Sequence, residues 1–242
     1  MLIVFRQSAW RAAGSQRAWY SRRLMRRYLL PLLLVVAGCE DSSTPTSPIG
    51  KTTNFFVTSA TSVTGNLGGL AGADATCQRL ATGAGHTGGT WRAYLSVERD
   101  PANGNRPTNA RDRIGAGPWY NANRLLIANN LAELHARSGD AILFVDEHGL
   151  PINGQWTGSP RPIEHDILTG SNADGTLASG LTCADWTSTA STIAARVGHS
   201  DGMGPNQSTA GSLSSWNSAH NSQSCANTAP GGGAGRFYCF AQ

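Results

Sequence analysis

The chain has 242 residues, with 19 basic and 15 acidic side chains. All of the positive excess lies in residues 1–38, which hold seven arginines and no acidic residue; from residue 39 on, 19 − 7 = 12 basic side chains stand against 15 acidic ones, a net charge of about −3. The remainder therefore lacks the positive field that nucleic acid binding requires, and no nucleic acid partner is expected.

The N-terminal segment is built like a secretory leader. An arginine block precedes the apolar run YLLPLLLVVAGC at Tyr28–Cys39. About ten apolar residues suit a signal peptide and fall short of the roughly twenty that span a bilayer. The ending VAGC resembles the lipobox of bacterial lipoproteins, which implies lipid attachment at Cys39. We predict a signal peptide over residues 1–38, with the true start left open between Met1 and Met25.

A polar tether follows the lipid cysteine. Residues 39–53 are rich in Ser, Thr and Pro and cannot bury a core. We expect an exported bacterial lipoprotein of the outer membrane, facing either the periplasm or the surface, with the membrane as partner through its lipid. Residues 54–242 are long enough for one domain with a sizeable core.

The domain opens with predicted strand and helix segments. NFFVTSA (Asn54–Ala60) has strand composition, and the glycines of GNLGGLAGADATCQ are expected to supply positive φ and close backbone approach. The following helix, Ala71–Ala81, is predicted to bury Ala71, Ala75 and Leu80 beside Cys77, with Asp74 in its first turn. The glycines match neither dinucleotide nor P-loop spacing, so nucleotide binding is not expected.

Further segments alternate between strand and turn composition. TWRAYLSV (Thr90–Val97) predicts a half-buried strand with Arg92, Tyr94 and Ser96 outward. Leu125–Ala136 is apolar but ambiguous in type, and Ala141–Asp146 predicts a strand that turns at His148-Gly149. Residues 150–223 have mostly the composition of turns. The segment Arg236–Ala241 predicts the last strand. The tryptophans of residues 54–242 are expected to be buried rather than exposed for sugar stacking, and they are Trp91, Trp119, Trp156, Trp186 and Trp216.

The cysteines of the domain predict disulfides rather than a metal site. Their even number in an exported chain favours two bridges among Cys77, Cys183, Cys225 and Cys239, with three pairings open from spacing alone. No CxxC occurs, and no histidine stands at ligand spacing from a cysteine. The histidines show no paired motif, and His165-Asp166 reads as a polar pair in a loop. No metal site is therefore predicted with any assigned ligand.

Two short motifs suggest a catalytic site and a calcium site. Gly198–Gly202 matches G-x-S-x-G, which would make Ser200 a hydrolase nucleophile, but no acidic residue follows Asp201 to complete a triad. The favoured interpretation is a polar surface loop. GSNADGT (Gly170–Thr176) offers oxygens for calcium, although the EF-hand register fails. The alternative is a turn formed by Asn-Ala-Asp-Gly.

Several segments in order resemble one known family. GNLGGLAGADATCQ with GTWRAYLS, then ILTGSNADG, LTCADWTS and a final SC…RFYCF, are similar to the endostatin domain of collagens XV and XVIII and to related bacterial lipoprotein domains. Residues 98–165 match poorly. The resemblance implies an α+β fold, a compact variant of the C-type lectin-like domain with a mixed, mostly antiparallel sheet, few helices and long loops. It also implies nested disulfides, Cys77–Cys239 and Cys183–Cys225.

Departures from the family limit what the resemblance implies for function. Endostatin holds zinc through N-terminal histidines, and none occur near Asn54. The calcium-dependent lectins use a WND motif, which here reads Trp216-Asn217-Ser218. Calcium is thus kept only as a candidate cofactor. The candidate ligand or calcium residues are Asn172, Asp174, Asp185, Trp216 and Asn217.

The sequence as a whole predicts a non-catalytic, lipid-anchored binding or adhesion module. Its expected ligand is a carbohydrate or an extracellular protein, bound in the loops between about residues 146 and 223. Two alternatives remain: a structural envelope lipoprotein without a small ligand, and a serine hydrolase that uses Ser200.

Overall fold

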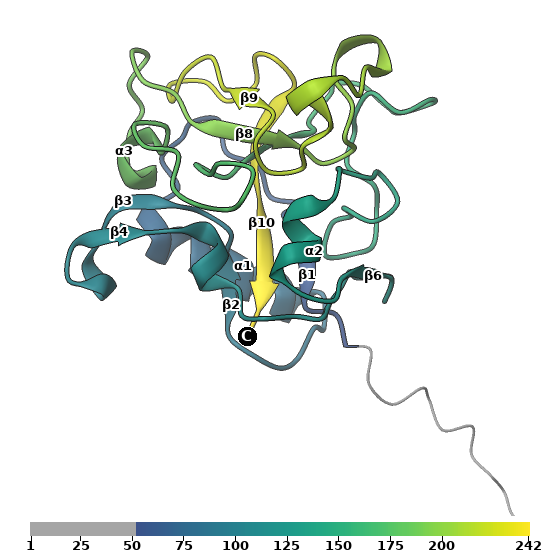
Figure 1. The fold of residues 1–242 in the computed structure, drawn as a ribbon, viewed down its shortest axis with the longest axis horizontal. Coiled ribbons are helices and arrows are strands. Elements are labelled where there is room, and N and C mark those ends of the chain that lie inside the picture. The colour runs from purple at the N-terminus through teal and green to yellow at the C-terminus, as the bar shows by residue number, and fades with distance from the viewer. Residues whose placement is uncertain (1–51) are drawn as a thin grey trace, which may run out of the picture. The chain divides into compact units, whose positions relative to one another are not determined.

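The computed structural model describes residues 52–242, so the predictions for the signal peptide, for Cys39 and for the tether up to residue 51 lie outside the described residues. Three helices occur in this part of the chain: α1 (Gly69–Gly83), α2 (Leu131–Ala136) and α3 (Cys183–Trp186). They accompany small, mostly antiparallel sheets and two disulfides (Figure 1). The predicted α+β class is confirmed at this level.

The main sheet is organised around β10 (Gly233–Ala241), which runs through the middle of the fold in Figure 1. It has six strands in the order β1-β10-β7-β8-β9, with β2 also paired to β10. β10 is antiparallel to β1 and β2 and parallel to β7, which is antiparallel to β8. The other strands of this sheet are β1 (Phe55–Val57), β2 (Trp91–Ala93), β7 (Asp166–Leu168), β8 (Arg196–His199) and β9 (His220–Asn221).

Two hairpins lie outside the main sheet. β3 (Val97–Asp100) pairs with β4 (Arg106–Thr108), and β5 (Trp119–Tyr120) pairs with β6 (Leu126–Ala128), both antiparallel. Short 3₁₀ turns complete the described part of the chain at Pro101–Asn103, Ala110–Arg113, Pro205–Gln207 and Gly211–Ser214.

Alternate side chains of β10 enter two separate hydrophobic cores. Phe237 and Cys239 belong to one cluster with α1, whereas Tyr238 and Phe240 belong to a second cluster with Trp216. This two-sided burial explains why the RFYCFA segment reads as a continuous apolar run. The burial predicted for the tryptophans is confirmed for Trp91, Trp119, Trp186 and Trp216, each at most 1% exposed, whereas Trp156 is partly exposed.

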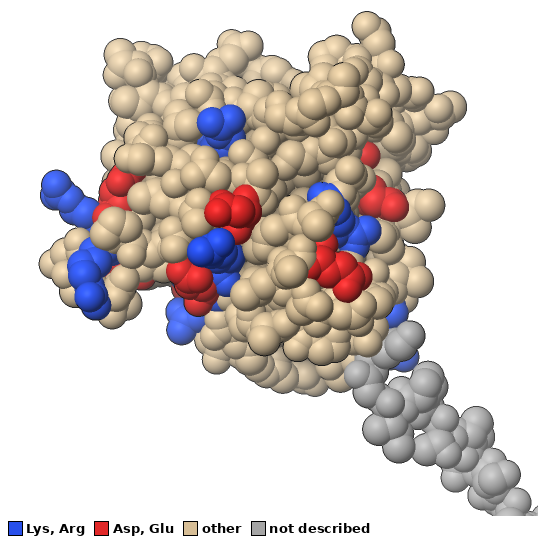
Figure 2. Space-filling view, in the orientation of Figure 1, with Lys and Arg blue, Asp and Glu red and all other residues tan. Residues whose placement is uncertain are grey.

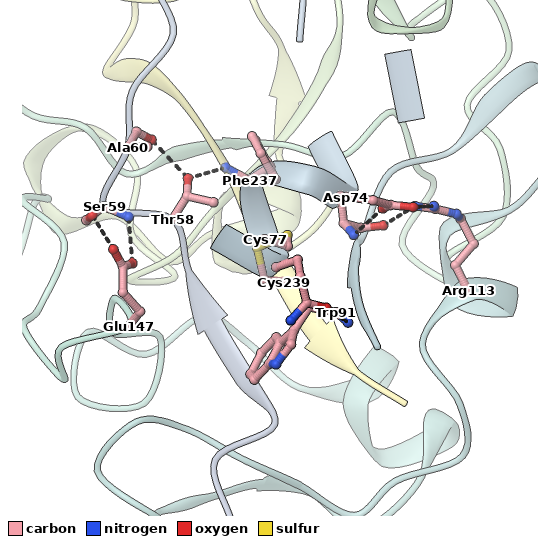
Figure 3. The surroundings of a disulfide bond; sticks show 12 residues. Thr58, Ser59, Ala60, Asp74, Cys77, Trp91, Arg113, Glu147, Phe237 and Cys239 are labelled. Atoms are coloured by element: carbon pink, nitrogen blue, oxygen red, sulfur yellow. Dashed lines mark hydrogen bonds and ion pairs between the residues drawn. A yellow bond between two sulfur atoms is a disulfide. The ribbon is translucent and has the colours of Figure 1, made fainter. Parts of the chain in front are cut away.

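The disulfides join Cys77 to Cys239 and Cys183 to Cys225, the two pairs that the family resemblance implies. The first ties α1 to the last strand through the first core cluster, and Figure 3 shows Trp91 beside it. The second holds α3 against the loop before β10. Each bridge therefore anchors a helix to a distant part of the chain.

Helix α1 presents a different face from the one predicted. It buries Ala73, Cys77 and Ala81, whereas Ala71 and Ala75 are exposed. The bond from Cys77 to β10 sets the rotation of the helix, so the residues four positions before and after Cys77 face the core. The placement of Asp74 in the first turn was also wrong, because the helix begins at Gly69.

Glycines before and within α1 perform the predicted backbone functions. Gly68 and Gly69 have φ of 77° and 70°. Gly72 lies so close to the preceding loop that a Cβ atom would stand 2.2 Å from the carbonyl oxygen of Leu67. The stretch is thus a structural turn into the helix.

We expect Gly72→Ala to lower the free energy of unfolding by about 1–3 kcal/mol or more, because the backbone of Leu67 must move. The matched control is Gly83→Ala at the end of the same helix, where a Cβ would meet nothing within 4 Å. This control should be neutral or up to about 1 kcal/mol more stable. Urea unfolding measures both, and equal stability of the two variants would contradict the close approach.

The structure corrects two predicted segments and defines a third that the sequence left ambiguous. The strand at Thr90–Val97 is interrupted, and Tyr94 and Ser96, predicted to face outward, are fully buried because they hydrogen-bond the Asn217 amide and the Ser171 hydroxyl. Residues 141–146 form a turn with only isolated bridges to Val57 and Pro151 instead of a strand. Residues 125–136 contain both β6 and α2, whose boundary is set by the side-chain cap of Asn130 on Glu133.

Candidate functional site

A groove lies between the start of α1 and the β3–β4 hairpin, and it is here called the α1–β3 groove. Its volume is about 650 Å³, within the usual range for small-ligand sites. Its walls are Gly68–Ala71, Asp74, Arg92, Val97, Arg99–Ala102, Thr108, Asp112, Arg113, Asp185, Thr187 and Gln242.

The charged side chains of the α1–β3 groove differ in whether they have a hydrogen-bond or ion-pair partner. Asp74 forms ion pairs with Arg92 and Arg113 at 2.8 and 2.7 Å. Asp185 accepts hydrogen bonds from the backbone N–H groups of Glu98 and Arg99 at 2.6 and 3.2 Å. The exposed Arg99 side chain has no hydrogen bond or ion pair within the described residues. The groove thus offers a free guanidinium beside an apolar floor.

The backbone of α3 beside the groove is strained. Four consecutive non-glycine residues, Cys183 to Trp186, have φ between 49° and 64°. A left-handed conformation costs non-glycine residues about 1–2 kcal/mol each. The turn is held by the disulfide at Cys183 and by the buried indole of Trp186, which donates to Ser96 O at 2.9 Å. It places Asp185 at the groove wall.

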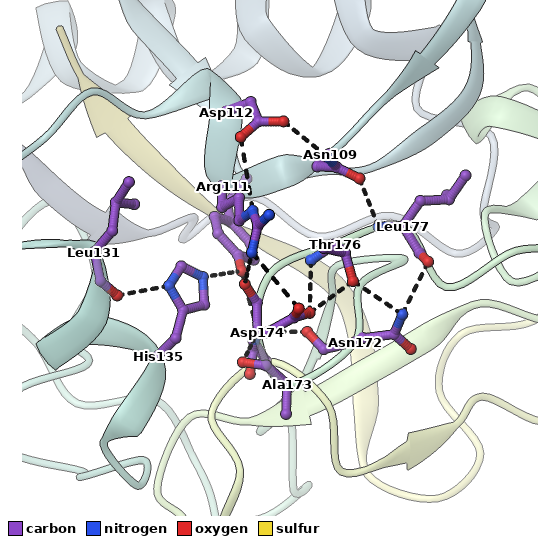
Figure 4. A network of polar contacts seen from close by, with 12 residues as sticks. Asn109, Arg111, Asp112, Leu131, His135, Asn172, Ala173, Asp174, Thr176 and Leu177 are labelled. Atoms are coloured by element: carbon purple, nitrogen blue, oxygen red, sulfur yellow. Dashed lines mark hydrogen bonds and ion pairs between the residues drawn. The ribbon is translucent and has the colours of Figure 1, made fainter.

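The predicted calcium residues do not converge. Asp174 is exposed and forms a turn in which its Oδ1 accepts from the N–H and hydroxyl of Thr176, while the Asn172 amide donates to Leu177 O (Figure 4). These bonds lower the pKa of Asp174. Asp185 lies instead at the α1–β3 groove. The Asn-Ala-Asp-Gly stretch is therefore the turn that the alternative interpretation predicts.

The other two candidate ligand residues belong to the interior. Trp216 is fully buried and donates its indole N–H to Leu134 O. Asn217 is 1% exposed, and its amide donates to Tyr94 Oη and to the carbonyls of Asn172 and Ala173. Asn217 therefore holds the 172–174 turn against the core, and neither residue lines the α1–β3 groove.

The GHSDG segment was predicted as a surface loop, and this is wrong. Gly198 and His199 end the buried strand β8, and Ser200 and Asp201 are 1% and 3% exposed. The Ser200 hydroxyl has no hydrogen-bond partner among residues 52–242, so no base in this part of the chain contacts it. A nucleophile needs a base within hydrogen-bond reach and access to substrate, and this geometry gives the hydrolase alternative no support.

The interpretation of His165-Asp166 as a loop pair is also wrong. Asp166 opens β7 and lies directly opposite His199 of β8, and both residues and His165 are at most 3% exposed. Asp166 Oδ1 lies 3.4 Å from Nε2 of His165, 3.4 Å from Nε2 of His199 and 3.5 Å from Nε2 of His220. We call these four residues the His–Asp cluster.

The electrostatics of the His–Asp cluster favour an ionised Asp166. Burial raises the pKa of its carboxyl, but the imidazoles of His199 and His220 outweigh burial and hold that pKa below the usual value. The same contact with Asp166 raises the pKa of His220. Burial also raises the pKa of the Asp201 carboxyl, but the hydrogen bond with His165 and those from two backbone N–H groups bring that pKa below normal. The carboxylates of Asp166 and Asp201 therefore lie beside the three imidazoles of the cluster.

Sequence spacing gave no indication of this cluster. His165 and Asp166 are adjacent, but His199 and His220 are brought to them by strand pairing across β7, β8 and β9. Metal motifs that are read from sequence depend on close spacing along one element, and this cluster has none.

Comparison with protein families identifies the family of the chain. A family model described as "Protein of unknown function (DUF1554)" matches residues 60–203, more than half of the chain. The chain belongs to the DUF1554 family. No curated protein matches it.

The DUF1554 match covers some of the structural features of the chain and not others. It contains α1, the β3–β4 hairpin and the residues Asp166 and His199, whereas His220 and the last strand β10 lie beyond it. The groove walls thus fall almost entirely within the family segment. Within residues 52–242, no helix of this DUF1554 protein is long and apolar enough to cross a membrane.

A second, smaller pocket of about 270 Å³ lies on the loops after α2. Trp156, Ile142 and Val145 contribute to its lining, and the Ile142 side chain is 71% exposed. Such exposed apolar residues often mark contact surfaces. This pocket is the rival ligand site to the α1–β3 groove.

Proposed function

We propose that this DUF1554 protein is a lipid-anchored, exported binding module of the bacterial cell envelope, without catalytic activity, that captures an anionic ligand in the α1–β3 groove. The observation that carries the proposal is the groove of about 650 Å³ beside the left-handed α3 turn. Backbone strain of this kind is concentrated at functional sites, where the surrounding structure enforces it.

The fold supports the same assignment. We propose that the domain is an endostatin-like variant of the C-type lectin-like fold. The support is the nested disulfide pattern, in which Cys77–Cys239 ties the first helix to the last strand and encloses Cys183–Cys225. The segment similarities at both ends of the domain agree with it.

The chemistry of the groove selects the ligand class. The groove wall holds four carboxylates, and each already accepts a hydrogen bond or forms an ion pair: Asp74, Asp100, Asp112 and Asp185. The Arg99 side chain has no partner within the described residues and is free to bind an anion. On the face shown in Figure 2, acidic and basic groups lie mostly next to each other and are separated by uncharged surface. A long polyanion would find no continuous basic track there, so a compact carboxylate-bearing glycan fits better.

A glycan array that carries neutral and carboxylate-bearing sugars, probed with and without chelator, tests the function. We expect binding to the carboxylate-bearing sugars in both conditions, because the groove holds no cluster of free carboxylates for calcium. An array without any binding would favour the alternative of a structural envelope lipoprotein. Binding of acidic peptides instead of sugars would replace the glycan by a protein ligand.

Arg99→Ala is expected to weaken binding of the selected sugar by about tenfold or more, since one charge-assisted hydrogen bond contributes about 1.5–3 kcal/mol. The matched control is Arg79→Ala, an exposed arginine of α1 that is not part of the groove wall. Isothermal titration calorimetry gives both affinities. An affinity that is unchanged in Arg99→Ala would remove the groove as the site.

Lipid anchoring is tested separately. Labelled palmitate should be incorporated into the wild-type chain and not into Cys39→Ser. Incorporation that persists in the variant would contradict the anchor.

A further inference from the structure

The histidines of the His–Asp cluster all present the same ring nitrogen to Asp166. His199 Nδ1 lies 2.8 Å from Leu213 O, and His220 Nδ1 lies 2.9 Å from Asn221 O. A carbonyl oxygen only accepts, so both Nδ1 atoms carry the hydrogen. In a neutral imidazole the other nitrogen, Nε2, then carries a lone pair, and it is Nε2 that faces Asp166 Oδ1.

His165 is oriented in the same way by a carboxylate. Its Nδ1 lies 2.7 Å from Asp201 Oδ1, while the other oxygen of Asp201 accepts from Gln155 N at 2.6 Å. Metal-binding histidines typically donate their second ring N–H to a carboxylate or a backbone carbonyl, which fixes the ring for coordination. All three histidines of the cluster have such a partner.

Within the part of the chain that the structure describes, Asp166 Oδ1 is a buried oxygen without a hydrogen bond. The residue is 3% exposed, and its distances of 3.4–3.5 Å to the three Nε2 atoms exceed hydrogen-bond length. An anionic oxygen that faces three imidazole nitrogens in the interior needs a positive charge beside it, which either protons on the imidazoles or a bound cation can supply. The rings of His165 and His199 also stack at 4.4 Å, where two imidazolium ions would repel each other.

The distances from Asp166 Oδ1 to the three imidazole nitrogens fit the edges of a tetrahedral site. In a tetrahedron the ligand atoms are separated by about 1.6 times the bond length, so zinc bonds of about 2.0–2.2 Å give edges of about 3.3–3.6 Å. Donor atoms of His165, Asp166 and His199 all lie within 4.8 Å of one another. His220, whose side chain is 36% exposed, closes the cluster towards solvent. Imidazole nitrogens with one carboxylate are a donor set suited to zinc.

We propose that His165, Asp166, His199 and His220 bind one divalent transition metal ion of the zinc class, and that Asp201 is a positioning residue that orients His165. The ion cross-links strands β7, β8 and β9. The site is separate from the α1–β3 groove, shares none of its residues and does not depend on the proposed ligand function.

The test uses the full chain, exposed to zinc, passed through metal-free buffer and analysed for bound metal by mass spectrometry. We expect about one zinc per chain, a higher melting temperature with zinc than with chelator, and the intense visible absorption of tetrahedral cobalt after exchange with Co²⁺. A chain that retains no stoichiometric zinc and shows no such cobalt spectrum would overturn the site.

Variants separate coordination from folding. His220→Ala, at a partly exposed position, and the isosteric Asp166→Asn are each expected to weaken zinc binding at least about 100-fold, and Asp201→Asn about 10–100-fold with a changed cobalt spectrum. His148→Ala, at an exposed histidine outside the cluster, is the control and should bind as wild type. Near-ultraviolet circular dichroism reports whether each variant is folded. Wild-type affinity in folded His220→Ala and Asp166→Asn would also overturn the assignment.

Discussion

Replacing both Cys77 and Cys239 by alanine is expected to lower the free energy of unfolding by about 5 kcal/mol. The two residues are separated by 162 positions, and cross-linking so long a loop restricts the unfolded chain strongly. The bridge also lies in the core beside Trp91, where Figure 3 shows it between α1 and β10. A loss of this size is comparable with the whole stability of many domains.

The Cys183→Ala, Cys225→Ala variant provides the comparison. Its loop spans 42 positions, for which the same argument gives a loss of about 4 kcal/mol. Urea unfolding without reductant measures both variants. If the Cys77, Cys239 variant lost less than about 1 kcal/mol, the outer bridge would not be the main staple of the fold.

Asp74→Ala is expected to cost about 3–5 kcal/mol, because it leaves a buried guanidinium without a counter-charge. The Arg113 side chain is 9% exposed, and both oxygens of Asp74 accept hydrogen bonds from it. Asp74 also accepts a hydrogen bond from Ala93 N on β2. The carboxylate therefore links α1, β2 and the turn at Ala110–Arg113.

Arg92→Ala is the matched control for this network. Arg92 binds the same carboxylate, but its side chain is 45% exposed, and such surface pairs contribute about 0–1 kcal/mol. Denaturant unfolding should therefore separate the two variants by about 2 kcal/mol or more. Equal losses would show that burial of Arg113 does not decide the energetics.

Local patterns predict the elements that repeat a simple period, but not those that depend on distant contacts. The strand at Phe55–Val57 and the part of β10 at Arg236–Ala241 follow from β-branched and aromatic composition, whereas the first three residues of β10 do not. The buried face of α1 does not, because the bond from Cys77 to Cys239 sets its rotation. Residues 141–146 have strand composition but form a turn, because tertiary context overrides propensity.

The candidate sites depend even more on tertiary structure. Asn172 and Asp174 are residue types that commonly bind calcium, yet their side chains form the hydrogen bonds of a turn instead. The His–Asp cluster is assembled from three strands, with a register that places Asp166 opposite His199. Arg99 belongs to no motif, and we propose it as a ligand contact only because its side chain lines the groove and has no partner among the described residues.

Amide chemical-shift mapping tests the binding role of the groove most directly. The ¹⁵N-labelled chain is titrated with the carboxylate-bearing sugar selected by the array. The account predicts that the shifts concentrate at Gly68, Arg92, Arg99 and Asp185, around the α1–β3 groove. Shifts that concentrate instead at Ile142 and Trp156, around the apolar pocket, would contradict it.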